Sequence, residues 1–146
     1  MQDNTSAIPT SRMDDHDEIC RVVQLYIDGA AKGDVSKLKE AFHQDARMFG
    51  GFLGSRYDAP IAELFRQFAS MPADTGRYRG RILSVSQAGD VAFAAVAEDG
   101  VWGKVSFVDY FLLTRIDGKW KITCKTFAHT GGEASRKPAS TESTPA

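Results

Sequence analysis

The chain has 146 residues, which is enough for one domain with a single hydrophobic core, and 42% of them are hydrophobic. Its formal net charge of -1 at pH 7 does not favour electrostatic binding to nucleic acid or to an anionic membrane. No run approaches the roughly 20 apolar residues of a membrane span, and the first residues lack the regions of a signal peptide. We therefore predict a cytoplasmic protein with no nucleic-acid and no membrane partner.

Both ends of the chain are too polar to join a folded core. Residues 1–12 are polar and contain one proline, and residues 131–146 consist mainly of Gly, Ser, Thr, Pro, Lys and Glu. Such segments bury too little apolar surface to offset the entropy lost on ordering. We predict a flexible tail at 1–12, a single domain at 13–130 and a disordered tail at 131–146.

Apolar residues at spacings of three and four predict three helices in the first half of the chain. The first follows an acidic stretch at 14–18 and ends near Lys32, where Gly33 is a typical stop. Asp34 can cap a second, shorter helix that ends near residue 42. Asp58 and Pro60 are typical of the start of a third helix, which ends near residue 71.

Alternating apolar residues predict β-strands in the second half of the chain. A short strand within "ARMFGGFLGSRY" at 46–57 breaks into a glycine turn, and four longer strands follow at 78–87, 90–98, 104–116 and 119–129. Asp117-Gly118 and Asp99-Gly100 are hairpin signals. Helices followed by antiparallel strands predict an α+β fold in which three helices pack on one face of a curved sheet and enclose a conical cavity.

The stretches "YIDGAAKGDVSKLKEAFHQDARMFG" at 26–50 and "DYFLLTRIDGKWKITCKTF" at 109–127 resemble the NTF2-like superfamily, whose members share a cystatin-like cone. Within it the chain is most similar to bacterial "putative lumazine-binding" and SnoaL-like proteins. The resemblance implies three N-terminal helices on a curved mixed or antiparallel sheet and a small-molecule ligand in the cone. It also implies a homodimer formed through the open sheet face.

The same resemblance suggests site residues by comparison with ketosteroid isomerase. Tyr26 falls on that enzyme's tyrosine, Asp109 on its protonated aspartate and Gly50 on its base. Glycine has no proton acceptor, so the known catalytic set is incomplete. The alternatives are that Tyr26 is a core residue with one hydrogen bond and that Asp109 is a structural partner of the helix layer.

His43 and Asp45 lie in the unit Phe-His-x-Asp-Ala, where the second helix gives way to a strand. In one interpretation they only close the helix and turn the chain. In the other, His43 reaches the mouth of the cavity and acts as a catalytic acid or base near neutral pH, with Asp45 orienting it.

Aromatic residues occur where the wall of the cone is expected. They either bind the ligand or pack against the helices or a second subunit, and a slip of one residue in strand phase exchanges the two assignments. Tyr110, Leu112 and Lys121 are expected on the dimer face. The predicted ligand-binding residues are Tyr26, Phe49, Phe52, Trp102, Phe107, Asp109 and Phe127.

No pattern indicates a metal, a cofactor or a nucleophilic triad. The three histidines are far apart in sequence, and "FGGFLGSR" lacks the lysine and helix of a phosphate-binding loop. Cys20 and Cys124 are predicted to be free, buried thiols.

Three hypotheses follow. The first is a cofactor-free homodimer that binds a small, partly apolar or aromatic ligand. The second is an isomerase, dehydratase or cyclase that uses His43 or Asp109 as acid or base. The third is a non-catalytic interaction domain with a filled cone.

Overall fold

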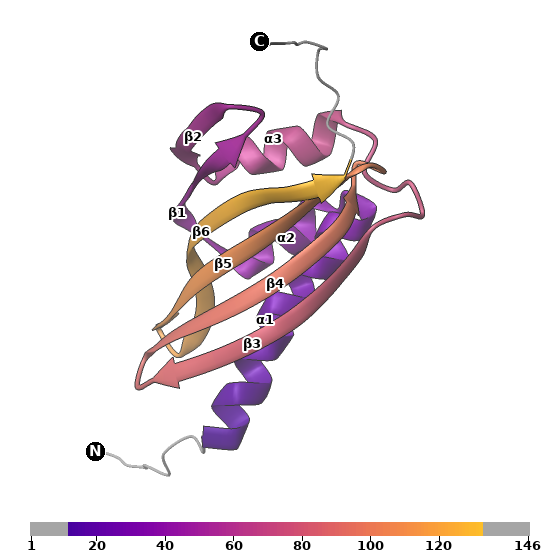
Figure 1. Cartoon of the computed structure of the whole chain (residues 1–146). Helices are drawn as coiled ribbons and strands as arrows, with labels where there is room; N and C mark the ends of the chain where they lie inside the picture. Colours follow the sequence, from indigo (N-terminus) through magenta and orange to yellow (C-terminus); the bar gives the residue numbers. More distant parts are fainter. Residues whose placement is uncertain (1–11, 133–146) are drawn as a thin grey trace, which may run out of the picture.

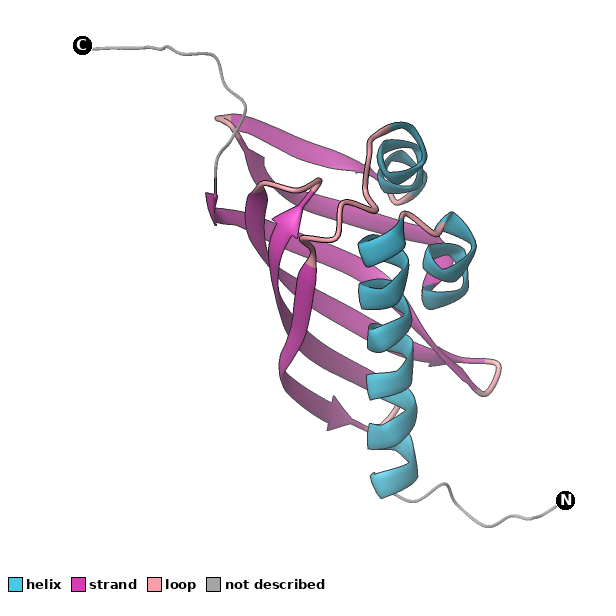
Figure 2. Ribbon diagram, turned by 90° about the vertical axis from the view of Figure 1, so that its right-hand side faces the viewer, coloured by secondary structure: helices cyan, strands magenta, loops and turns pink. Residues whose placement is uncertain are grey.

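The computed structural model of the protein describes residues 12–132, in which three helices pack on one six-stranded sheet. Figures 1 and 2 show α1 and α2 against one face of the curved sheet and α3 across one end of it. This confirms the predicted α+β cone. The helices are α1 (Arg12–Lys32), α2 (Val35–Ala41) and α3 (Ala62–Ser70), and the strands are β1 (Phe42–Phe52), β2 (Ser55–Pro60), β3 (Arg79–Ala88), β4 (Val91–Val101), β5 (Val105–Ile116) and β6 (Lys119–Gly132).

The sheet has the strand order β2-β1-β6-β5-β4-β3. Within residues 12–132, β1 and β6 pair in parallel and the other neighbours pair antiparallel. The sheet is therefore mixed. The parallel pair brings the first strand beside the last, so residues far apart in the sequence lie next to each other.

The helices begin and end largely as the sequence predicts. Gly33 has a φ of 68° and ends α1 in the left-handed conformation that glycine adopts without strain. Asp34 then caps α2, because its side chain accepts a hydrogen bond from the backbone N–H of Lys37 at 3.3 Å. The buried face of α1, which includes Ile19, Val23 and Tyr26, packs on the sheet.

The predicted start of the third helix is wrong. Asp58 and Pro60 belong to β2, and α3 begins only after Ile61, which offers no side-chain cap. The reason is tertiary pairing: β2 pairs with β1 from Arg47↔Pro60 to Phe52↔Ser55, and the Arg47 guanidinium binds the Asp58 carboxylate at 2.8 Å. These contacts outweigh a local helix signal.

One of the two predicted hairpin turns is confirmed. Asp117 and Gly118 have φ values of 52° and 79°, as a two-residue hairpin turn requires. The prediction of a turn at Asp99-Gly100 is wrong, because β4 continues to Val101 and the chain reverses at Trp102–Lys104. A register shift between Glu98 and Val101 absorbs Gly100 within the strand.

A bulge in β6 changes which of its side chains face the helices. Leu112 pairs with Cys124 and Leu113 with Ile122, so Thr123 has no partner in the register. Before the bulge Ile122 faces the core, and after it Lys125 does. Such an insertion shifts a strand's period-two pattern by one residue.

The predicted tails fall outside the described residues except at their inner ends, where Arg12 begins α1 and Gly131 and Gly132 end β6. Cys20 and Cys124 are free, and both are half-buried rather than fully buried. None of the helices in residues 12–132 is both long and apolar enough to cross a membrane.

Candidate functional site

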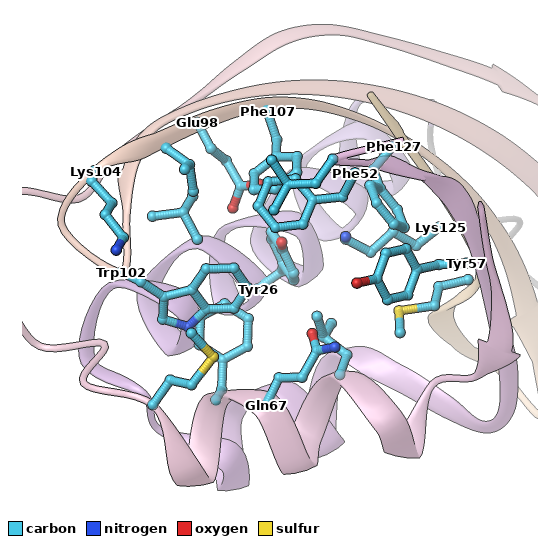
Figure 3. A pocket seen from close by; sticks show the side chains of 17 residues that line it. Tyr26, Phe52, Tyr57, Gln67, Glu98, Trp102, Lys104, Phe107, Lys125 and Phe127 are labelled. Carbon is cyan, nitrogen blue, oxygen red and sulfur yellow. The ribbon is translucent and has the colours of Figure 1, made fainter. Parts of the chain in front are cut away.

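A cavity of about 200 Å³ opens between α3, the β1–β2 hairpin and the concave face of the sheet. Figure 3 shows aromatic side chains around it and the polar ends of Tyr26, Glu98 and Lys125 pointing into it. The wall is therefore mostly apolar, with a few polar groups gathered at its deep end, as in a typical small-molecule site. The lining residues are Tyr26, Met48, Phe52, Leu53, Tyr57, Leu64, Gln67, Phe68, Met71, Glu98, Val101, Trp102, Lys104, Val105, Phe107, Lys125 and Phe127.

The aromatic wall is built from rings that touch one another. Phe107 lies at its centre, with ring centroids 5.3 Å from Phe52 and 5.9 Å from Phe127. Trp102 extends the wall, 6.5 Å from Phe107, and packs on Phe68 of α3 at 5.5 Å. Tilted and edge-to-face ring contacts of this kind stabilise one another beyond the area they bury.

The deep end is formed by a tyrosine, an acid and a lysine from three elements. Tyr26 of α1 donates its O–H to Asp109 Oδ2 of β5 at 3.1 Å, and Asp109 is fully buried. Lys125 Nζ of β6 is 3.5 Å from Asp109 Oδ1 and 4.3 Å from the centre of the Phe127 ring. Lys125 therefore carries a positive charge to the cavity and is held by an anion on one side and an aromatic face on the other.

Glu98 of β4 adds a second buried acid. In the β4–β5 register Val96 pairs with Asp109 and Glu98 with Phe107, so the two acids are diagonal neighbours on one face. Tyr78 donates its O–H to Glu98 Oε2 at 2.7 Å. Glu98 is 2% exposed and lines the cavity, whereas Asp109 is fully buried behind the lining residues.

Burial controls protonation at this end of the cone. The pKa of Glu98 is raised well above its usual value, first by burial and then by the negative charge of Asp109. Burial also raises the pKa of Tyr26 well above its usual value, and the charge of Asp109 adds to the effect. Both effects favour the neutral carboxylic acid form of Glu98. In that form the charged partners at the site are Lys125 and Asp109.

The structure brings together most of the residues predicted to bind a ligand. Tyr26, Phe52, Trp102, Phe107 and Phe127 line one cavity, and Asp109 supports it through Tyr26.

Phe49 requires a correction. Its side chain is 40% exposed and does not line the cavity, and the Arg47 guanidinium lies 5.7 Å from its ring. Strand alternation explains this, because Met48 takes the inward position on β1 and is buried in the cavity wall.

His43 does not line the cavity. It is half-buried on β1 directly after α2, and its Nδ1 accepts a hydrogen bond from the Asp45 backbone N–H at 3.0 Å. The β1–β6 register shifts between Phe42 and Arg47, and both residues lie within this irregular segment. The geometry matches the interpretation in which they close the helix and turn the chain.

Gly50 is fixed by close packing rather than by a need for flexibility. It pairs with Phe127 of β6, and a Cβ added to it would lie 2.7 Å from atoms of the Phe127 ring and still closer to the Phe127 carbonyl oxygen. No side chain fits there without moving a wall of the cavity. A base at this position is therefore excluded by the backbone as well as by the residue type.

Two site residues were missed by sequence reasoning. Glu98 shares the phase of Ala94 and Val96, both fully buried, and this alternation was the available signal. Lys125 had no comparable signal, because the bulge at Thr123 reverses the phase of β6 before it.

Within residues 12–132, no group of three or more His, Cys, Asp or Glu side chains could hold a metal ion. The side chains at the site can donate hydrogen bonds, transfer protons and supply an amine nucleophile.

Comparison with known proteins gives a consistent picture of the fold. The family described as "Putative lumazine-binding" matches residues 14–128. The chain is similar to the aldolase FrzH of Cladobotryum sp, with 22% identity over 113 residues that cover 77% of this chain and 90% of that protein.

Two solved structures are also similar. An NTF2-like protein of unknown function from Methylobacillus flagellatus KT has 32% identity and a TM-score of 0.74, covering 83% of this chain and 96% of its own. An NTF2-like protein of unknown function from Shewanella baltica OS155 has 24% identity and a TM-score of 0.72, covering 87% of this chain and 100% of its own.

Proposed function

Since the chain belongs to the "Putative lumazine-binding" family of NTF2-like proteins, we propose that its conical cavity binds a small, partly apolar or aromatic molecule. The observation that carries this proposal is the cavity of about 200 Å³, whose aromatic wall ends in a few convergent polar groups. A filled cone, as an interaction domain would have, does not match such a cavity.

The polar groups favour a ligand that accepts hydrogen bonds. The Tyr26 O–H is already donated to Asp109, so the donors that line the deep end of the cavity are the ammonium of Lys125 and the neutral form of Glu98, which burial favours. A flat heteroaromatic ring with carbonyl oxygens, such as lumazine, offers acceptors at its edge and faces that stack on Phe107 and Trp102. This combination supports the family's description as a guide to ligand class.

The test is a fluorescence titration. The chain has two tryptophans, and Trp120 lies away from the cavity against the Arg115 guanidinium, 4.9 Å from its ring. In a Trp120→Phe variant, Trp102 in the wall becomes the only reporter. We expect saturable quenching by lumazine and by naphthalene derivatives that bear a carbonyl.

The control is Val105→Trp, which fills the cavity from β5 and should abolish binding. Calorimetry on the wild type and on this variant measures binding without depending on the added tryptophan. Equal binding to the open and filled proteins, or no saturable binding by any probe, would refute the proposal.

A second candidate is acid–base catalysis on a carbonyl compound, and the observation that favours it is the buried pair of acids beside Lys125. Glu98 would donate its proton to the carbonyl oxygen, Asp109 would act as the base, and Tyr26 would hold Asp109 in place. The similarity to a protein named as an aldolase supports the same reaction class. Deuterium exchange next to the carbonyl of a bound ketone, followed by NMR, should be lost in Glu98→Gln if this role is real.

We also propose that two copies pair through the outer face of the sheet. Leu83, Tyr110 and Leu112 are 56%, 50% and 52% exposed on β3 and β5. Lys121, expected on this face, instead donates to the backbone carbonyl of Glu40 at 2.6 Å. Light scattering should find a dimer for the wild type and a monomer for Leu112→Lys, and a monomeric wild type would contradict the proposal. A cytoplasmic location stays a prediction.

A further inference from the structure

Lys125 is the least expected side chain in this cavity. It is 5% exposed, although an ammonium is rarely buried because water solvates it far better than protein does. Its pairing with Asp109 is loose: the two charged atoms are 3.5 Å apart, and Asp109 Oδ1 has no hydrogen-bond partner among the described residues. Such a pair contributes little net stability, so structural pairing alone does not account for a lysine at this place.

We propose that Lys125 captures the carbonyl group of a ligand covalently, as an imine, at the deep end of the cavity. This inference rests on the proposed function, because the ligand must first bind in the same cavity. It also narrows the ligand to an aldehyde or ketone attached to an apolar or aromatic body. Lys104 also lines the cavity, but it is exposed at the β4–β5 turn, and no acid within residues 12–132 forms an ion pair with it.

The groups around Lys125 supply each proton transfer that the reaction requires. Asp109 takes one proton from the ammonium, and the resulting amine attacks the carbonyl carbon to form a C–N bond. Glu98 lines the cavity and burial favours its protonated form, from which it donates to the carbonyl oxygen as the C=O double bond opens. It then recovers its proton from the nitrogen.

Loss of water completes the step. The hydroxyl of the tetrahedral intermediate leaves with the proton held by Asp109, and the C=N bond forms. The net change is an ammonium and a carbonyl giving a protonated imine and water, so charge and protons balance without any other reactant. The protonated imine keeps its positive charge beside Asp109 and the Phe127 ring, as the ammonium did.

The other groups that face this position do not compete for the carbonyl. Tyr26 from α1 already donates to Asp109, and Tyr78 donates to Glu98. Tyr57 from β2 lines the cavity beside Phe127, with 6.1 Å between the ring centroids. Its ring therefore extends the aromatic surface against which a flat carbonyl compound can stack.

The experiment is reductive trapping on the full chain. The probe is 2-naphthaldehyde with sodium cyanoborohydride, which reduces an imine to a stable secondary amine, and peptide mass spectrometry locates the label. We expect Lys125 to be labelled at least about tenfold more than Lys104, because a preorganised amine with an acid beside it reacts faster than a solvated one.

Two variants test the assignment of the label. Lys125→Arg keeps the positive charge beside Asp109 but cannot form an imine, so it should lose the label at this position. Lys104→Arg, matched in chemistry, should keep the label at Lys125. Circular dichroism of both variants confirms that they are folded.

The possible failures are distinguishable. Saturable quenching of Trp102 by naphthaldehyde without preferential labelling of Lys125 would overturn this inference and leave the binding proposal standing. Equal labelling of Lys125 and the exposed lysines would overturn it as well. No binding of lumazine or of any naphthalene probe would overturn the proposed function and this inference together.

Discussion

Replacing Glu98 with glutamine should make the protein more stable near neutral pH, because the substitution removes a buried group that can ionise. Glu98 is 2% exposed and has a pKa raised well above its usual value, so the folded state keeps its proton where the unfolded state has released it. The amide oxygen that Glu98→Gln introduces can still accept the hydrogen bond from the Tyr78 O–H. The substitution therefore removes the titration and keeps the contact.

The magnitude follows from proton linkage. Below the unfolded pKa of about 4.3, Glu98 is protonated in both states and the variant gains nothing. Above that pKa, up to the raised folded pKa, the folded state binds one more proton than the unfolded state. The wild type then loses about 1.4 kcal/mol of stability per pH unit relative to the variant. Between pH 5 and pH 7 the difference grows by up to about 2.7 kcal/mol in favour of Glu98→Gln.

The assay is urea unfolding followed by far-UV circular dichroism at several pH values and one protein concentration. Glu40→Gln is the matched control, because Glu40 is 58% exposed and loosely paired with Arg21 at 3.9 Å. Parallel stability curves for wild type and Glu98→Gln would refute the assignment of a neutral acid. A wild type that gains stability with pH would show that Glu98 is ionised and stabilised by Lys125.

Three further predictions concern the scaffold of the site. Gly50→Ala should cost about 1–3 kcal/mol in urea unfolding and weaken ligand binding, because its Cβ displaces Phe127; unchanged stability would contradict the close packing. Tyr26→Phe should cost about 1–3 kcal/mol by leaving a buried Asp109 oxygen unpaired, and an unshifted urea midpoint would show that water replaces the hydroxyl. Arg115→Met should lower stability most near neutral pH and less below about pH 4, because the hydrogen bond from Arg115 lowers the pKa of Asp15 and the stability it contributes disappears as Asp15 protonates. A stability gap that does not vary with pH would contradict the Arg115 prediction.

The sequence was sufficient for the architecture because the signals of the core are local. The apolar spacing of α1, the Gly33 stop and the Asp117-Gly118 turn each depend on a few neighbouring residues, and all three hold in the structure. The β2 strand was missed because its partner, β1, provides the stabilising contacts, while its own residues Asp58 and Pro60 favour a helix start.

The site was harder to predict because it depends on strand phase. Phe107 and Asp109 share the buried face of β5, as their spacing of two residues indicates, because β5 alternates without interruption between them. Lys125 could not be found in this way: the bulge at Thr123 depends on pairing with β5, and a pattern read along β6 alone places Lys125 on the outer face. Phe49 shows the opposite error, in which an aromatic residue was assigned inward on a strand whose inward residue is Met48.

The same charges that decide stability also decide which ligands the cavity accepts. With Glu98 protonated, the positive charge of Lys125 and the negative charge of Asp109 cancel, and a neutral molecule enters without leaving an uncompensated charge in an apolar site. Were Glu98 ionised, the site would carry one excess negative charge and would favour a cation over a carbonyl compound. The pH dependence of Glu98→Gln therefore tests the ligand class as well as the stability: a neutral Glu98 is required both for a neutral ligand and for proton donation to its oxygen.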